Sequence, residues 1–264
     1  MYFPLYSLYL SIAGYQSIGY IQSNYLKSER YYDVFGCSCF VLMGGACAAL
    51  RYNQGILSNR SLLASGLIVL WSGRLLYFLN NRIKKHNGID KRFNGVRNNS
   101  KRLFVYWFMQ ALWNCATLTP LFLLTYTFNQ SNLNLDTLDY ILCGCWTFGY
   151  LFEIISDSQK TRFLDDPKNK GKWIDVGLWN YIRHPNYFSE IIMSWSVYCL
   201  CARGYPSNSI LYQSIALVSP IFTTMIMCKI STPMLEKSAD KKWSSNPDYQ
   251  RYKNSTWKLI PGLC

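Results

Sequence analysis

The sequence predicts an all-α fold, a polytopic transmembrane helix bundle of about seven spanning helices. Half of the 264 residues are hydrophobic and 17% are aromatic, and the apolar residues gather in long runs separated by basic segments. A helix needs about 20 apolar residues to cross the hydrocarbon core of a bilayer. Seven runs approach this length: 2–21, 34–50, 62–80, 103–127, 138–156, 187–205 and 210–228.

The first two runs carry the weakest signals. Run 2–21 is rich in Ser, Gly, Gln and Tyr, and run 34–50 is short. No basic segment precedes run 2–21, so we expect no cleaved signal peptide, and a signal-anchor helix is the alternative. A soluble all-helical protein is disfavoured, because so many near-spanning apolar faces are hard to bury in any other way.

The formal net charge of +13 is distributed unevenly. Segment 81–102, segment 157–186 and the tail from residue 229 hold eight, six and seven of the 27 basic residues, whereas the connection 129–137 holds none. Seven spans would place all three basic segments on one side, which the positive-inside rule assigns to the cytosol. We therefore expect a cytosolic C-terminus. Nucleic-acid binding is disfavoured, because the basic runs flank apolar ones.

The ten cysteines do not have the spacing of a metal site or a disulfide framework. The chain has no Cys-x-x-Cys pair and only two histidines, so we expect no zinc site. Residues two apart do not share a helix face, and we interpret the cysteines as small packing residues. Three pairs have this spacing: Cys37/Cys39, Cys143/Cys145 and Cys199/Cys201.

Ionisable side chains near the ends of two apolar runs mark candidate sites, because a charge at membrane depth is costly. Arg74 shares one helix face with Phe78 and Arg82, with Tyr77 beside them. The alternative for Arg74 is a side chain that snorkels to the headgroups.

The end of run 138–156 carries a second polar face. Glu153, Asp157 and Lys160 are spaced at i, i+4 and i+7, which places them together on a helix. The alternative is a helix end that frays into the membrane interface.

Residues 177–190, GLWNYIRHPNYFSE, form the densest polar motif. Pro185 suits the first turn of a helix, so we expect the sixth helix to begin there, directly after Arg183 and His184. The free N–H groups of a helix start attract anions, and an adjacent arginine can bind phosphate.

Two side chains of the same motif follow on the new helix. Asn186 and Glu190 lie one turn apart with Tyr187 next to them, and Glu190 can accept hydrogen bonds from ribose hydroxyls or an amide. The motif therefore predicts a pocket for a phosphorylated, hydroxyl-rich cofactor. The alternative is a structural Arg–Glu clamp between helices.

The stretch 152–198 resembles the C-terminal domain of the steroid 5α-reductase-like membrane proteins. It looks most similar to their uncharacterised DUF1295 branch, which shares the pattern GLW-Y-RHPNYFGE. The similarity continues in the tail, through Thr232-Pro233-Met234-Leu235-Glu236-Lys237 and Tyr252-Lys253. We expect a single integral membrane domain over residues 1–264. Within it, residues 1–60 form variable N-terminal helices and residues 61–264 form the region that resembles this family.

The resemblance implies an NADPH-dependent reductase that acts on a carbon–carbon double bond of a sterol-like or other lipid substrate that enters from the bilayer. It also implies a role in lipid metabolism. A basic, multi-span chain with free cysteines fits the endoplasmic reticulum of a eukaryote, and a bacterial inner membrane is the alternative. The resemblance implies cofactor contacts for six residues: Arg74, Glu153, Asp157, Asn186, Tyr187 and Glu190. Polar and aromatic residues near them complete the candidate cofactor-binding set, namely Arg82, Lys160, Arg162, Trp173, Arg183 and His184.

The sequence departs from the family pattern at its catalytic positions. Trp71 stands at the position of the tyrosine that polarises the ketone in steroid reductases, and the first helix has no carboxylate. Ser189 replaces a glycine that lets the backbone approach the cofactor. Tyr77 and Tyr187 are the candidate proton donors.

Two other functions remain open at this stage. Membrane methyltransferases that act on prenylcysteine or phospholipids also carry an Arg-His-Pro-x-Tyr motif before a helix, and they use S-adenosylmethionine. The segment from Asp157 to Lys172 and Asn186 favour the reductase. The third possibility is a non-catalytic membrane protein of the same fold.

Overall fold

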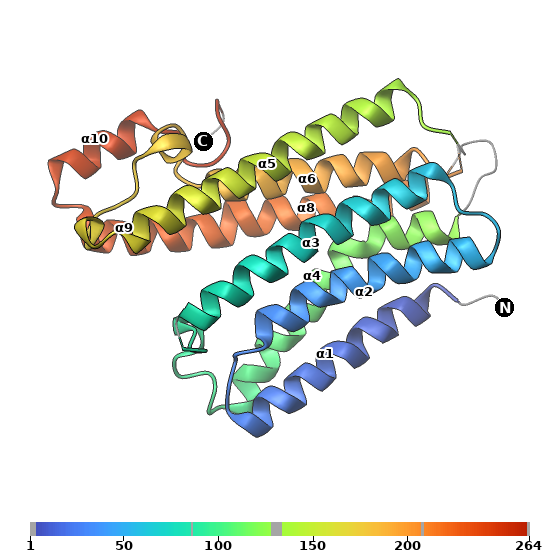
Figure 1. Cartoon of the computed structure of the whole chain (residues 1–264), viewed down its shortest axis with the longest axis horizontal. Helices are drawn as coiled ribbons and strands as arrows, with labels where there is room; N and C mark the ends of the chain where they lie inside the picture. The colour runs from blue at the N-terminus through green and yellow to red at the C-terminus, as the bar shows by residue number, and fades with distance from the viewer. Residues whose placement is uncertain (1–3, 86, 128–133, 207–208, 263–264) are drawn as a thin grey trace. The chain divides into compact units, whose positions relative to one another are not determined.

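A computed structural model describes residues 4–85, 87–127, 134–206 and 209–262. Within these ranges the chain is helical and contains no strand, so the predicted all-α class is confirmed (Figure 1). The main elements are α1 Tyr6–Leu26, α2 Tyr32–Asn53, α3 Asn59–Lys85, α4 Ser100–Tyr126, α5 Thr137–Asp165, α6 Pro185–Ala202, α7 Ile210–Ala216, α8 Val218–Met225, the π-helix η5 Ile226–Ser231, α9 Thr232–Trp243 and α10 Pro247–Ser255.

The predicted apolar runs coincide largely with helices: five of them with α1 to α5 and run 187–205 with α6, whereas run 210–228 is divided among α7, α8 and η5. The first residues of run 2–21 lie outside the described part of the chain. Four helical segments are long and apolar enough to cross a membrane: Tyr32–Asn53, Asn59–Lys85, Thr137–Asp165 and Ile210–Trp243. These segments indicate a multi-pass integral membrane protein. Helices α1, α4 and α6 are long enough but less apolar, so the count of seven spans stays a prediction.

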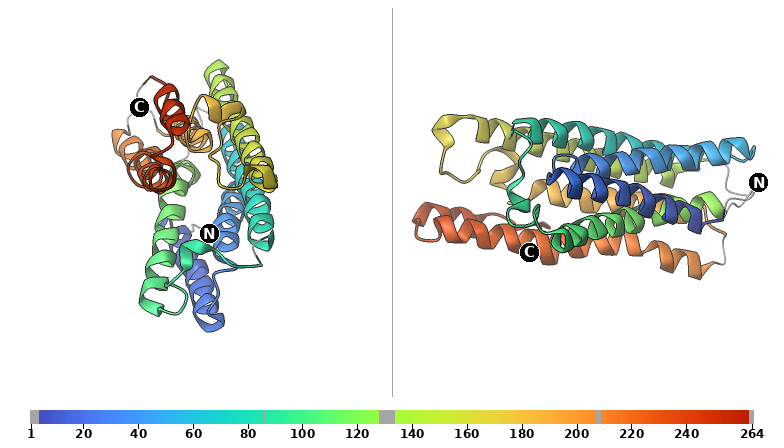
Figure 2. Two further views of the ribbon diagram at one scale, coloured as in Figure 1. Left: turned by 90° about the vertical axis from the view of Figure 1, so that its left-hand side faces the viewer. Right: turned by 90° about the horizontal axis from the view of Figure 1, so that it is seen from below.

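The chain divides into two compact units. Unit 1 comprises Met1–Asp136 and Tyr198–Ser219, and unit 2 comprises Thr137–Val197 and Pro220–Cys264. Unit 1 is built from α1 to α4 with the end of α6 and α7. In it, α2 packs against α1, α3 and α4, and α1 also packs against α4 (Figure 2).

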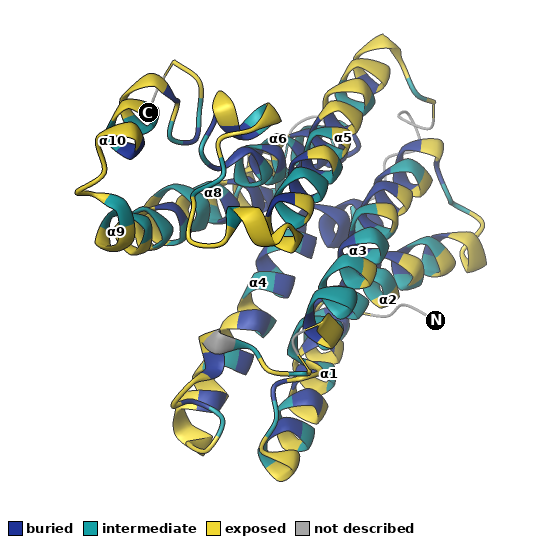
Figure 3. Cartoon of the chain, turned by 60° about the vertical axis from the view of Figure 1, so that its left-hand side comes forward, coloured by how far each residue is buried: buried dark blue, intermediate teal, exposed yellow. Residues whose placement is uncertain are grey.

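Three amide side chains join α1, α2 and α4 inside unit 1. Gln16 Nε2 donates to Asn114 Oδ1 at 2.7 Å, and Gln110 Nε2 donates to Gln16 Oε1 at 2.9 Å. Asn114 Nδ2 reaches the carbonyl oxygen of Gly36 on α2 at 3.1 Å. All three amides are buried, on faces that alternate with exposed residues along the helices (Figure 3). Polar residues thus lower the hydropathy of α1 and α4 while bonding to each other, as interhelical hydrogen bonds in membranes do.

The amide network requires a glycine on α2. A Cβ atom at Gly36 would lie 2.8 Å from Gln110 Oε1, whereas one at Gly45 on the same helix would have no atom within 4 Å. Gly36 therefore allows α4 to approach α2 closely enough for the bonds to form.

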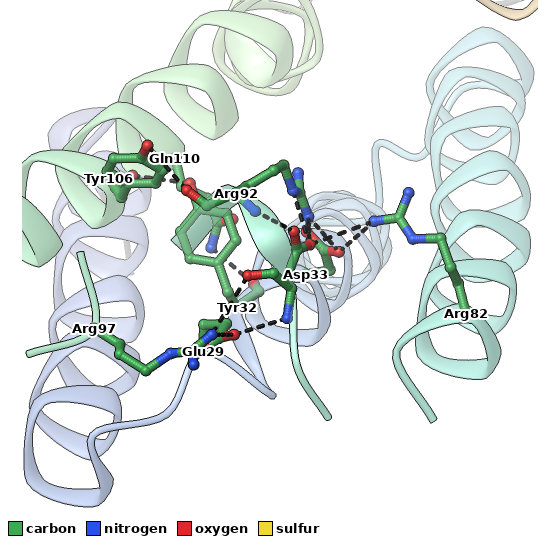
Figure 4. Close-up of polar contacts among 9 residues, drawn as sticks. Glu29, Tyr32, Asp33, Arg82, Arg92, Arg97, Tyr106 and Gln110 are labelled. Atoms are coloured by element: carbon green, nitrogen blue, oxygen red, sulfur yellow. Dashed lines mark hydrogen bonds and ion pairs between the residues drawn. The ribbon is translucent and has the colours of Figure 1, made fainter. Parts of the chain in front are cut away.

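At each end of unit 1, hydrogen bonds and ion pairs connect loops that lie at that end. At one end, Arg97 Nε donates to Glu29 Oε2 at 3.0 Å and Arg92 Nη2 donates to Asp33 Oδ2 at 2.9 Å, which joins the start of α2 to the loop before α4 (Figure 4). At the other end, Arg203 forms an ion pair with Asp136. Successive loops lie at opposite ends of the unit, as expected when each helix runs its full length.

The charged end of unit 1 is held by shared carboxylates. Arg82 pairs with Asp33 at 3.1 Å, and Arg92 binds both Asp33 and Asp90 (Figure 4). Burial raises the pKa of Asp90, but the hydrogen bonds from Arg92 outweigh it and hold that pKa below its usual range. Asp90 is therefore ionised at neutral pH, and its ion pair with Arg92 holds the loop.

The described part of unit 2 contains α5, the segment 166–184, most of α6 and of α8, and all of η5, α9 and α10. Helices α6 and α8 are joined by Ser194 Oγ to Thr223 Oγ1 at 3.3 Å and Trp195 Nε1 to Thr224 Oγ1 at 3.1 Å. The π-helix η5 follows α8 directly. Such segments are rare and are frequently found at functional sites.

The first prediction concerns Gly36. We expect Gly36→Ala to destabilise the protein by about 1–3 kcal/mol, because the added methyl group overpacks the contact with Gln110. Gly45→Ala is the matched control and should be neutral or slightly stabilising, since alanine is the better helix former. Thermal unfolding of the detergent-purified variants measures both. Equal melting temperatures for the two variants would contradict the close-approach argument.

The second prediction concerns topology. We expect cysteines introduced at Gln54, between α2 and α3, and at Asn98, before α4, to react with an impermeant maleimide from opposite sides of the membrane. Most of the predicted basic-free connection 129–137 lies outside the described residues, so Gln54 is the better reporter. The unsubstituted chain sets the background labelling. Labelling of both positions from the same side would exclude alternating spans through α3.

Candidate functional site

The polar centre of unit 2 begins at the start of α6. Pro185 is the first residue of α6, as the sequence predicts. The backbone N–H groups of Tyr187 and Phe188 both donate to the carbonyl oxygen of His184 at 3.2 Å. His184 and Arg183 are therefore fixed directly before a helix N-terminus, where the helix dipole favours negative charge.

The residues before α6 are attached to the end of α5. Leu178 N donates to Gln159 Oε1 at 2.9 Å, and Trp179 Nε1 donates to the carbonyl oxygen of Ser156 at 3.0 Å. Gly177 has a φ of 59°, and a Cβ atom there would lie 2.3 Å from Gln159 Nε2. Glycine is thus required both for the backbone conformation and for the close approach to α5.

Arg183 connects this segment to the C-terminal residues. Its Nε donates to Glu236 Oε1 at 3.1 Å, and its Nη1 donates to the carbonyl oxygens of Lys253 at 2.6 Å and Thr256 at 2.7 Å. Its backbone N–H also donates to Trp257 O at 2.8 Å. The structure therefore places Arg183 in an Arg–Glu clamp. This arrangement is the clamp that the sequence offers as the alternative to phosphate binding, and its carboxylate is Glu236 on α9.

His184 shares the same carboxylate. Its Nε2 lies 2.9 Å from Glu236 Oε1. A carboxylate only accepts hydrogen bonds, so the proton is assigned to Nε2, and Nδ1 carries the lone pair. Burial lowers the pKa of His184, and the bond to Glu236 only partly offsets this. His184 is therefore a neutral acceptor at pH 7, and its ring stacks on Tyr187 with centroids 5.7 Å apart.

Two carboxylates of α5 are buried in unit 2. Glu153 is 2% exposed and Asp157, one turn later, is 6% exposed. Their similar burial agrees with the predicted common helix face. Asn186, Tyr187 and Glu190 on the first turns of α6 are only partly buried. Unit 2 thus contributes two buried carboxylates from α5 and three polar side chains from α6.

Basic and aromatic residues surround the end of α5. Lys160 Nζ lies 5.0 Å from the centroid of the Trp179 ring, and Arg162 is exposed. Trp173 packs against Tyr249 with ring centroids 5.3 Å apart. Its Nε1 is buried and has no hydrogen-bond partner among the residues described. This indole N–H is a donor available to a ligand.

The remaining predicted site residues belong to unit 1. The guanidinium carbon of Arg74 lies 5.4 Å from the Phe78 ring centroid, which confirms their common face. Arg82 is engaged with Asp33, as described above. Tyr77 is 72% exposed, so unit 1 alone provides no enclosed environment for it. The other candidate proton donor, Tyr187, stacks on the titratable side chain of His184 within unit 2.

The sequence interpretation missed the contribution of α9 and α10. Glu236 receives both Arg183 and His184, and the backbone of Lys253 and Thr256 completes the clamp. A signal was present, because residues 232–237 and 252–253 share the family pattern. The charges of these residues are also typical of a solvent-exposed helix end, so charge alone does not identify them as site residues.

The third prediction concerns pH. Burial lowers the folded-state pKa of His184, so the unfolded chain takes up the proton first as pH falls below about 6.5. Stability is therefore lost between that value and the lower folded pKa. We expect His184→Gln to flatten the decrease in melting temperature between pH 7.5 and pH 5.5. His86→Gln, which removes the only other histidine, is the control. An unchanged slope in His184→Gln would contradict a neutral His184.

Comparisons with known proteins identify one relationship. Neither a search of curated proteins nor a search of solved structures found a match. The family described as a protein of unknown function, DUF1295, matches residues 19–256. This range includes the clamp between Arg183 and Glu236 and almost all helices of both units. The chain is therefore a member of the DUF1295 family.

Proposed function

We propose that the protein is a membrane-embedded reductase that binds NADPH in unit 2 and reduces a carbon–carbon double bond of an apolar lipid substrate. The observation that carries the proposal is the combination of buried Glu153 and Asp157 with the His184–Glu236 pair in one unit of a membrane protein. Ionisable groups among spanning helices are costly and by default indicate function. The resemblance to steroid 5α-reductase-like proteins supplies the reaction class.

The residues of unit 2 fit a phosphorylated dinucleotide. Glu153, Asp157 and Glu190 can accept hydrogen bonds from ribose hydroxyls, and the partnerless indole N–H of Trp173 can donate. Phosphate binding is assigned to Lys160 and Arg162 and to the exposed lysines that follow them. These lysines are Lys168, Lys170 and Lys172. Arg183 is a positioning residue, because its donors are directed at Glu236 and the C-terminal carbonyls.

When bound, NADPH supplies a hydride. The other carbon of the reduced double bond needs a proton, and we assign its delivery to Tyr187, which stacks on neutral His184. The protein's further contribution is to orient the two reactants and exclude water.

The aromatic surroundings of Trp71 favour a substrate other than a steroid enone. Trp71 packs against Phe40 and Trp113 in unit 1, with ring centroids 5.3 and 6.3 Å away. An indole N–H is not an acid that can replace the phenol of a catalytic tyrosine. We therefore propose a sterol-like or other lipid whose double bond is activated differently.

One observation is compatible with the methyltransferase alternative. The commitment of Arg183 to Glu236 leaves phosphate binding to exposed side chains, and S-adenosylmethionine has no pyrophosphate to bind. Both cofactors are therefore compared directly.

We propose a membrane orientation with the C-terminus and segment 166–184 in the cytosol, where NADPH is available. Exposed lysines of this segment and of α9 support it through the positive-inside rule. They are Lys168, Lys170, Lys172, Lys241 and Lys242. For the location of the membrane we propose the endoplasmic reticulum.

The fourth prediction tests the cofactor. We expect NADPH, and not S-adenosylmethionine, to raise the melting temperature of the purified protein. Asn186→Ala and Glu190→Ala should each weaken NADPH binding by about 1–3 kcal/mol, the scale of a lost buried polar partner. Asp248→Asn is the control, because Asp248 pairs with Arg251 on the exposed face of α10.

The same proposal requires transfer of the hydride. Membranes that contain the protein are incubated with deuterated NADPH and a lipid extract, and deuterium should enter a reduced lipid. Asp157→Asn should abolish the incorporation, and Asp248→Asn should retain it. Methyl transfer from S-adenosylmethionine to a lipid would establish the alternative and overturn the reductase.

A further inference from the structure

Thr232 is the first residue of α9, and its hydroxyl is buried without a partner. The residue is 1% exposed, and Oγ1 has no hydrogen-bond partner among the residues that the structure describes. Threonines in helices ordinarily bond to the carbonyl four residues earlier. Among the described residues, this bond is made by Thr119, Thr125, Thr147 and Thr224 within helices and by Thr127 and Thr256 at helix ends, whereas Thr117 on α4 also lacks a partner.

The π-helix explains why Thr232 differs. The backbone N–H of Thr232 donates to the carbonyl oxygen of Met227, five residues earlier, rather than to the one four residues earlier. The wider turn of η5 shifts the carbonyls away from the position that a helical threonine normally reaches. A buried hydroxyl without a partner is costly, so its retention points to a ligand.

The position of Thr232 relates it to the polar centre of unit 2. Thr232 and Glu236 are four residues apart on α9 and share a face, and Glu236 contacts His184. Helices α6 and α8–α9 run antiparallel, because Ser194 pairs with Thr223 while His184 pairs with Glu236. Thr232 therefore lies at the level of the first turns of α6, which contain Tyr187.

The two polar atoms at this level are chemically complementary to a primary amide. With the proton on Nε2, Nδ1 of His184 carries the lone pair and can accept a hydrogen bond. The Thr232 hydroxyl, which has no partner among the described residues, can donate to a carbonyl oxygen. A carboxamide offers an N–H donor and a carbonyl acceptor to such a pair.

We propose that Thr232, together with His184 Nδ1, recognises the carboxamide of the nicotinamide ring. The inference rests on the proposed function and assigns the ring end of the cofactor to the junction of η5 and α9. The phosphates would then lie toward Lys160 and Arg162. This order agrees with the direction of α9, which runs from the apolar segment toward its basic end at Lys241 and Lys242.

Thr232→Val tests the inference, because it removes the hydroxyl and keeps the shape. Without ligand, the melting temperature should rise or stay constant, since a partnerless polar group is lost. The Kd for NADPH should rise about tenfold, which corresponds to about 1.4 kcal/mol. The Kd for 2′-phospho-ADP-ribose, which lacks the nicotinamide, should not change. Thr232→Ser should bind NADPH like the wild type.

A measurement on the unsubstituted protein provides a second test. The 3-acetylpyridine analogue of the oxidised cofactor has a methyl group in place of the amide nitrogen, so it should bind about tenfold more weakly than NADP⁺. Equal affinities would overturn the assignment of the amide to this site, whatever the folding of the variants.

The outcomes separate the two proposals. Binding of NADPH with equal affinity by wild type and Thr232→Val overturns the role of Thr232 and leaves the reductase standing. An equal loss for NADPH and 2′-phospho-ADP-ribose places Thr232 away from the nicotinamide and overturns the inference. A lower melting temperature of ligand-free Thr232→Val shows that the hydroxyl is bonded within the protein. Absence of NADPH binding by the wild type overturns the proposed function itself.

Discussion

The structure depends on one constraint: polar groups placed among membrane helices need partners within the protein or in a bound ligand, because the hydrocarbon core offers none. Between α1, α2 and α4 of unit 1, the neutral amides of Gln16, Gln110 and Asn114 meet this constraint. Unit 2 meets it with charges, through one carboxylate that receives Arg183 and His184. The difference separates a structural network from a chemical one. Amides do not titrate, whereas the Glu236 cluster contains groups whose protonation can change.

The cluster in unit 2 also shows how a single side chain can organise a site. Glu236 Oε1 accepts from both Arg183 and His184, so it fixes the guanidinium, the imidazole tautomer and, through ring stacking, the orientation of Tyr187. None of these residues is adjacent to α9 in sequence. A pocket that depends on a shared acceptor is rigid, because movement of one donor alters the bond of the other.

The sequence predicts the helices well, because apolar runs and Pro185 are local signals. It also predicts shared faces, such as that of Arg74 and Phe78, from helical periodicity alone. It does not predict the clamp, because the choice between phosphate and Glu236 as partner of Arg183 depends on how α9 packs. The π-helix is equally hidden, since no residue type specifies it. Hydropathy also undervalues α1 and α4, because it treats Gln16 and Asn114 as exposed although they bond to each other.

The clamp has a consequence for how the protein is made. Arg183 and Lys253 are 70 residues apart, so the segment before α6 leaves the ribosome well before the carbonyl groups that hold it. During that interval the guanidinium lacks the carboxylate and the carbonyl groups that it binds in the folded protein. The polar centre of unit 2 therefore cannot be complete until residues 253–257 have been synthesised and have folded back onto the segment before α6.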